Sequence, residues 1–177
     1  ILARILGVPF YDHQIVSLAA RESGLSEECV QQIDGKKPTG SFLYDLFMSP
    51  GNLPVADQVY LAERAVIEKA AQEKCVIVGR CADYVLKDRP DCLNVFIHAP
   101  LEARVRRVVE EYGDETDGDA TAFVQKMDRR RASYYQGCTG RKWGDARNYD
   151  LCVSTHIGIE NAAALIAFAV KRMEEMA

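Results

Sequence analysis

The residues best suited to phosphate chemistry begin at Gly79-Arg80, directly after the apolar run 75–78. A glycine lets a ligand approach the backbone closely, and an arginine side chain donates paired hydrogen bonds to a phosphate group. Asp83 lies three residues further on. The same dipeptide also fits a plain turn with a surface salt bridge, so the pattern alone leaves both interpretations open.

A second group, residues 126–135, continues a predicted helix and contains three consecutive arginines. On a helix Asp128 and Arg131 share one face, whereas Arg129 and Arg130 diverge from it. This spacing would present one carboxylate-supported arginine to an anion while the neighbouring arginines reach a second anion. A solvated basic face is the alternative interpretation.

Basic charge is concentrated around that helix. Residues 126–147 contain seven cations and two anions, a local balance of +5, although the chain as a whole has a formal net charge of −4. The cations are Lys126, Arg129, Arg130, Arg131, Arg141, Lys142 and Arg147. Glycines around the last three predict a hinged basic flap over residues 136–147, in which Trp143 either anchors the flap or stacks on a base. An anion-binding segment on an acidic body favours a small anionic ligand over nucleic acid.

Composition sets the class of protein that carries these groups. The chain has 177 residues, 48% apolar and 27% charged, which predicts a single globular domain over residues 1–177. No apolar run approaches the roughly 20 residues that cross a bilayer, and no signal peptide opens the chain. We therefore expect a cytoplasmic protein without membrane contact. The six cysteines lack C-x₂-C spacing, which predicts reduced thiols and no protein-bound metal.

Apolar runs that alternate with helical patterns predict how these groups are positioned. The expected strands are residues 8–11, 75–78, 93–97 and 151–153, and the expected helices are residues 55–73, 101–112, 120–135 and 159–176. This alternation is typical of an α/β protein whose parallel sheet has helices on both faces. Ligands of such sheets bind beyond the carboxyl ends of the strands. That rule selects Asp12, Arg80, Asp83, His98 and Ser154 as candidates.

Five segments together resemble the P-loop nucleoside monophosphate kinases, and within them the bacterial cytidylate-kinase-like branch. The segments are residues 9–12, 76–83, 128–135, 139–144 and 148–152. The resemblance covers most of the chain and implies a P-loop fold with a five-stranded sheet. It also implies an acceptor-binding excursion over about residues 12–54 and a basic lid over about residues 120–147.

The resemblance implies roles for individual residues. Asp12 matches the start of the acceptor-binding region, and Arg80 matches the arginine that holds the acceptor's phosphate. Asp83 lies near an acidic residue of that region. Asp128 is associated with the acceptor nucleotide in this family. The catalytic lid arginines would be Arg131, Arg129 and Arg130, with Lys126, Arg141 and Arg147 as weaker phosphate-binding candidates.

The implied reaction is transfer of the ATP γ-phosphoryl group to a nucleoside monophosphate, most closely CMP or dCMP, with Mg²⁺. The partners would be small nucleotides, with no nucleic acid and no membrane, and the sequence indicates no oligomeric state. Two departures from the family pattern favour an alternative, a nucleotide-binding regulatory module without turnover. Cys81-Ala82 separates Arg80 from Asp83, and Val124 replaces a lid arginine. A nucleic-acid contact through the arginine-rich segment is a third interpretation.

The phosphate-binding loop itself does not occur in the printed residues, which contain no G-x-x-x-x-G-K-S/T motif. Apolar residues at positions 1, 2, 5 and 6 precede Gly7 as the end of a helix that has no start. We therefore expect roughly 20–30 further residues upstream, an apolar strand and a glycine-rich or serine-rich turn. Without them the printed chain is expected to be inactive.

Overall fold

The computed structural model describes residues 1–24, 28, 54–112 and 119–176. The elements of its first part are α1 (Leu2–Leu6), β1 (Phe10–Tyr11), α2 (Gln14–Ser23), α5 (Val55–Ala70), β2 (Val76–Ile77) and α6 (Ala82–Val85). The elements of its second part are β3 (Val95–His98), α7 (Leu101–Tyr112), α8 (Ala120–Thr139), η2 (Ala146–Asn148), β4 (Leu151–Ser154), η3 (Thr155–Ile157) and α9 (Ile159–Met176). The four predicted helices are confirmed, although α5 ends earlier and α8 later than predicted. Most of the predicted excursion lies outside the described residues.

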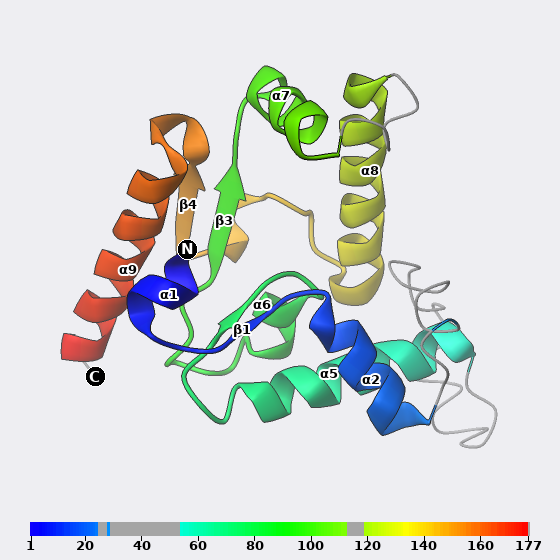
Figure 1. Cartoon of the computed structure of the whole chain (residues 1–177). Helices are drawn as coiled ribbons and strands as arrows, with labels where there is room; N and C mark the ends of the chain where they lie inside the picture. The colour runs from blue at the N-terminus through cyan, green and yellow to red at the C-terminus, as the bar shows by residue number, and fades with distance from the viewer. Residues whose placement is uncertain (25–27, 29–53, 113–118, 177) are drawn as a thin grey trace.

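The strands pair in parallel, as predicted, but the described strands do not form one sheet. β1 pairs with β2 in the register Phe10 to Val76 and Tyr11 to Ile77, and β3 pairs with β4 from Val95–Leu151 to His98–Ser154. The result is two separate two-stranded sheets (Figure 1). No strand among the described residues pairs with both sheets, so the single five-stranded sheet that the resemblance implies stays a prediction.

Each sheet has its own apolar core. Tyr11 and Ile77, opposite each other in the first sheet, pack against a cluster contributed by α2, α5 and α6, which comprises Ile15, Ala19, Val66, Ile67 and Ala82. Val153 of β4 packs against the α9 residues Ala162 and Ile166, with Leu2 of α1 beside them. α9 and α1 therefore cover β3 and β4, whereas α2 and α5 cover β1 and β2 (Figure 1). No helix in the described part of the chain is long and apolar enough to cross a membrane.

α8 connects the two parts of the molecule. The Asp119 side chain caps its start by accepting a hydrogen bond from the Ala122 amide at 2.8 Å, and Gly140 ends it in the left-handed conformation. Val124 and Tyr135 are buried on one face of the helix, because they lie eleven residues apart, close to three turns. α7 packs against α8, beside its upper turns in Figure 1.

The predicted flap is anchored to β3 by aromatic contacts. Residues 136–139 belong to α8. Beyond Gly140, Trp143 contacts Phe96 edge to face with ring centroids 5.5 Å apart, and Tyr149 contacts the same ring at 5.0 Å. Trp143 therefore anchors the segment, one of its two predicted roles.

Substitution of Gly144 by alanine should destabilise the protein more than the same change at Gly140. Both glycines have positive φ, +73° and +69°, but only at Gly144 would an added Cβ lie 3.1 Å from Phe96 Cζ. We expect Gly140→Ala to lower the free energy of unfolding by about 1 kcal/mol and Gly144→Ala by about 2 kcal/mol. Urea unfolding of both variants measures the difference. Equal losses of unfolding free energy would mean that the Phe96 ring moves aside at little cost and does not anchor the segment that contains Trp143.

Candidate functional site

The ends of β1 and β2 bring together the first predicted site residues. Because the two strands are parallel and in register, Asp12 and the Gly79-Arg80 turn leave the same edge of the sheet. The Val78 amide donates to the Tyr11 carbonyl at 2.8 Å, immediately before both segments. Asp12 Oδ1 accepts a hydrogen bond from the Gln14 amide at 3.3 Å and lies 2.8 Å from His13 Nδ1. Asp12 therefore supports the start of α2, although His13 is its N-cap residue.

The turn that carries Arg80 has an unusual backbone. Gly79, Arg80 and Cys81 all have positive φ, at +80°, +55° and +55°. Arg80 and Cys81 are the only non-glycine residues with positive φ among the described residues. A left-handed residue with a side chain costs about 1–2 kcal/mol, and such residues concentrate at functional sites. The strain supports a functional rather than a purely structural role for this turn.

Arg80 is held by a buried carboxylate from α5. Its Nη1 donates to Glu63 Oε1 at 3.1 Å, and the Tyr134 hydroxyl of α8 donates to Glu63 Oε2 at 2.9 Å. Side-chain exposure is 2% for Glu63 and 16% for Arg80. The three residues come from α5, the turn after β2 and α8, so this cluster joins the core to the predicted lid helix.

Glu63 is unusually easy to protonate for a glutamate. Burial raises its pKa to about 7, and the hydrogen bond from Tyr134 opposes this shift. The Arg80 guanidinium beside it also favours the carboxylate form. Burial lowers the pKa of Arg80, but a guanidinium stays charged at any physiological pH. The cluster therefore contains one permanent cation and one carboxyl group that titrates near neutrality.

The stability of a Glu63→Gln variant should rise relative to the wild type as pH increases. Because the pKa of Glu63 is raised from its ordinary value of 4.5 to about 7, the folded state holds a proton that the unfolded chain releases. The proton on Glu63 therefore stabilises the folded state fully below about pH 4.5, and this stabilisation is lost as pH rises to 7. We expect the stability difference between the two proteins to change by about 3 kcal/mol over this range. Urea unfolding at pH 5 to 8 tests it, and a constant difference would contradict the assignment.

Asp83 and Tyr135 form a second contact between α6 and α8. The Tyr135 hydroxyl donates to Asp83 Oδ2 at 2.6 Å. Burial and the Asp83 carboxylate raise the pKa of Tyr135, so the phenol remains a donor. Asp83 therefore lies beside the Arg80 turn, as its sequence position implies, with its carboxylate engaged by the lid helix.

The Asp128 carboxylate on α8 contacts two arginines, one on α7 and one on α8 itself. Arg104 of α7 donates two hydrogen bonds to it, from Nη1 to Oδ2 at 2.8 Å and from Nη2 to Oδ1 at 2.6 Å. Arg131 Nη1 lies 3.5 Å from Oδ1, which confirms the predicted pairing of Asp128 with Arg131. The Arg131 side chain is 55% exposed, so one carboxylate orients two guanidinium groups and leaves Arg131 accessible.

The remaining lid candidates lie on α8 and on the segment after it. Lys126, Arg129 and Arg130 are exposed on α8. The Arg141 guanidinium lies 5.2 Å from the Tyr84 ring centroid. Arg147 pairs with Asp145 at 2.6 Å and lowers the pKa of that carboxyl to about 2. The structure thus links the Arg80 turn and Asp83 to α8 through Tyr134 and Tyr135, and it pairs Asp128 with the exposed Arg131.

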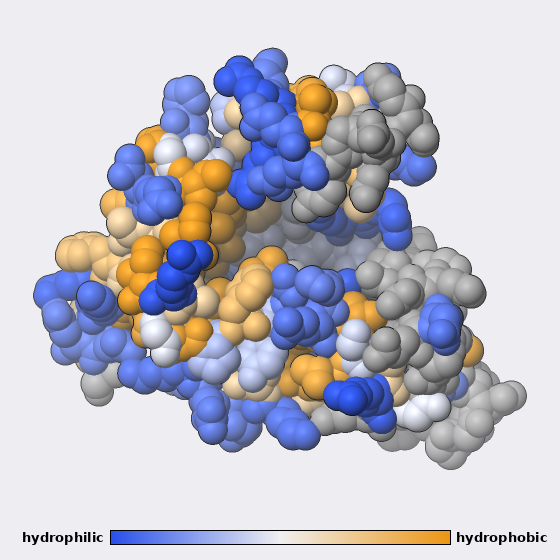
Figure 2. Space-filling model, in the orientation of Figure 1, coloured by the Kyte–Doolittle hydropathy of each residue, from blue (hydrophilic) through white to orange (hydrophobic). Residues whose placement is uncertain are grey.

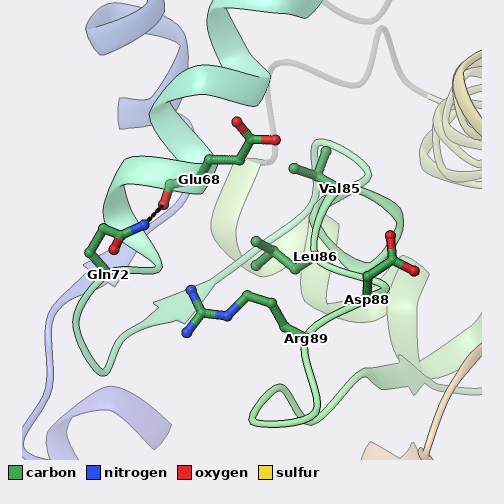
Figure 3. A pocket seen from close by; sticks show the side chains of 6 residues that line it. All are labelled: Glu68, Gln72, Val85, Leu86, Asp88 and Arg89. Carbon is green, nitrogen blue, oxygen red and sulfur yellow. Dashed lines mark hydrogen bonds between the residues drawn. The ribbon is translucent and has the colours of Figure 1, made fainter.

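The molecule is hollowed between the part that carries α7 and α8 and the part that carries α2 and α5 (Figure 2). A separate pocket of about 300 Å³ lies between α5 and the segment after α6, with Glu68, Gln72 and Arg89 in its lining (Figure 3). Arg89 donates there to the Ala71 carbonyl at 2.6 Å and to the Asp91 carboxylate. This pocket contains none of the predicted site residues.

Glu63 and Arg104 were not predicted from the sequence, although both carry a recognisable signal. Glu63 lies four residues after Val59 and three before Val66, within the apolar stripe of α5. Arg104 lies three residues after Leu101 and four before Val108, within the stripe of α7. A charged residue at a core position of an amphipathic helix needs a buried partner. That rule would have selected both residues, though not their partners.

Comparison with known proteins identifies the family of the chain. The fold and site are those of a mixed α/β protein with an arginine turn beyond two parallel strands. The model of the cytidylate kinase-like family matches residues 1–157, and the chain belongs to this family. A crystal structure of an uncharacterized protein from Eubacterium ventriosum ATCC 27560 is similar, with a TM-score of 0.71 and 26% identity over 97% of this chain and 88% of that one. No curated protein matched the chain. The protein is therefore nucleotide kinase-like.

Proposed function

We propose that the protein transfers the terminal phosphoryl group of ATP to a nucleoside monophosphate, with CMP or dCMP as the preferred acceptor. The strained turn that fixes Arg80 against the buried Glu63, at the ends of two parallel strands, carries this proposal. Ligands of parallel α/β folds bind at that edge, and a planar guanidinium suits the phosphate of an acceptor nucleotide. Asp12 lies at the same edge.

In the proposed reaction, an oxygen of the acceptor's phosphate attacks the γ-phosphorus of ATP as the bond to the ADP oxygen breaks. Arg80 holds the acceptor's phosphate. Arg131, oriented by Asp128 and Arg104, offers an accessible cation to the transferred group, where negative charge must be neutralised. Arg129 and Arg130 are further candidates for the phosphates, and Lys126, Arg141 and Arg147 are weaker ones.

Mg²⁺ would accompany ATP in this reaction. In the described part of the chain, no three His, Cys, Asp or Glu side chains are arranged to hold a metal ion. Mg²⁺ commonly keeps several waters and binds mainly to substrate phosphates. No step above depends on a magnesium ligand from the protein.

We also propose that the two sheets are parts of one P-loop sheet. Each described strand pairs on one edge only, and Phe10, Val78 and Ile97 are between 45% and 55% exposed at the strands and their ends. A further parallel strand between the two sheets would pair both inner edges and cover apolar surface. A crystal structure of the protein made from its complete gene tests this arrangement. Two isolated strand pairs in that structure would contradict it.

A second candidate is a nucleotide-binding module without turnover. Asp83 and Asp128 are engaged by Tyr135 and Arg104, and Val124 is buried at the position of a lid arginine. Calorimetry that shows tight nucleotide binding, combined with the absence of phosphoryl transfer, would favour this module.

ADP release from ATP, measured on the protein made from its complete gene across the common nucleoside monophosphates, tests the proposed kinase. We expect the highest kcat/KM with CMP or dCMP. Preference for another monophosphate would correct the acceptor, and absence of activity on all of them would contradict the kinase. Binding to RNA or DNA that falls steeply with salt would instead support the arginine-rich segment as a nucleic-acid contact.

A further inference from the structure

The Glu63 carboxylate and the Arg80 guanidinium form an ion pair inside the proposed acceptor site. The pair is 3.1 Å long and nearly buried, with side-chain exposures of 2% and 16%. An acceptor phosphate on Arg80 would bring a second anion to a cation that already has a buried counter-ion. Two anions on one buried guanidinium repel each other, and the repulsion is weakly screened because little water reaches the pair.

We propose that Glu63 is the counter-ion of the acceptor site, which holds Arg80 in place while the site is empty and takes up a proton when the phosphate of a nucleoside monophosphate binds. The carboxylate accepts one proton from solvent and becomes a carboxylic acid, and no other bond changes. Glu63 is thus a positioning residue that acts through Arg80. This inference rests on the proposed function, because it requires Arg80 to bind the phosphate.

The surroundings of Glu63 favour its protonation when a phosphate binds to Arg80. Among the described residues, Glu63 interacts with the Arg80 guanidinium, the Cys81 thiol and the Tyr134 hydroxyl. Burial already raises the pKa of Glu63 to about 7, and a second anion within about 4–6 Å raises a carboxyl pKa further. The Tyr134 hydroxyl favours the carboxylate, so it sets the pH at which the exchange occurs.

Titration calorimetry with CMP tests the inference on the protein made from its complete gene. Measurements at pH 8 in two buffers of different ionisation enthalpy give the number of protons taken up. We expect about one proton per CMP, and a Kd that rises by up to about tenfold per pH unit above pH 7. Cytidine, which lacks the phosphate, should bind without proton uptake.

Two variants separate this mechanism from a purely structural role. Glu63→Gln keeps the shape of the side chain but cannot titrate, so CMP binding should take up no proton and Kd should be constant between pH 7 and 8.5. Tyr134→Phe removes the donor that favours the carboxylate, so the rise in Kd should begin at a higher pH than in the wild type.

The outcomes distinguish this inference from the proposed function. CMP binding without proton uptake in the wild type would overturn the role of Glu63 and leave the acceptor site in place. Uptake that persists in Glu63→Gln would also overturn it. Binding of no nucleoside monophosphate at all would overturn both the inference and the proposed function.

Discussion

Replacement of Arg80 by alanine is expected to lower kcat/KM for the acceptor nucleotide by about one to three orders of magnitude, with a raised acceptor KM. A charge-assisted hydrogen bond to phosphate contributes about 1.5–3 kcal/mol, and more if it strengthens in the transition state. Initial-rate kinetics with varied CMP at saturating ATP measure the loss. Arg172→Ala is the matched control, because Arg172 lies on α9 and pairs with Glu175 three residues away, and its kinetics should be unchanged.

The same substitution also tests whether Arg80 is merely structural. Without the guanidinium, Glu63 remains buried with Tyr134 as its partner. We expect Glu63 to accept a proton, which limits the loss of unfolding free energy near neutral pH to about 1–3 kcal/mol. Unchanged kinetics in the folded fraction, together with a larger loss of stability, would identify a structural salt bridge and no phosphate site.

Replacement of Arg131 by alanine is expected to lower kcat by about tenfold to a thousandfold while the acceptor KM changes little. Arg131 is 55% exposed, whereas its partner Asp128 is held by two hydrogen bonds from Arg104. The cation is therefore oriented but available to the charge on the transferred group. Rapid-quench measurement of a single turnover separates this step from product release.

Arg107→Ala provides the control for that experiment. Arg107 lies on α7 and pairs with Glu111 four residues away, with both side chains about half exposed. Its loss should leave turnover unchanged. If Arg131→Ala instead raised the acceptor KM without an effect on kcat, Arg131 would belong to acceptor binding and the proposed lid chemistry would be wrong.

Local sequence patterns predicted the helices and the parallel pairing well. α7 and α9 have the predicted bounds, because the apolar stripe of each helix has its 3.6-residue period. β1 and β2 are shorter than predicted, with two residues each. Apolar runs show that a segment is buried, but strand length depends on which neighbours supply hydrogen bonds.

The partners of the site residues could not be predicted from the sequence. Glu63 lies 17 positions from Arg80 and 71 from Tyr134, and no local rule links residues so far apart. Arg104 binds Asp128 because α7 packs against α8. The short spacing between Asp128 and Arg131, by contrast, was sufficient to predict their pairing. Sequence reasoning thus found contacts within one helix and missed those made by packing.

The most direct test of phosphoryl transfer at this site follows the phosphoryl group itself. Protein made from the complete gene is mixed with ATP labelled at its γ-phosphorus and unlabelled CMP, and the products are separated and counted. We expect label in the β-phosphate of CDP, formed at the same rate as ADP and lost when Arg80 is replaced by alanine. Label that appears only in inorganic phosphate, or remains in ATP although CMP binds, would contradict the assignment of this site to phosphoryl transfer.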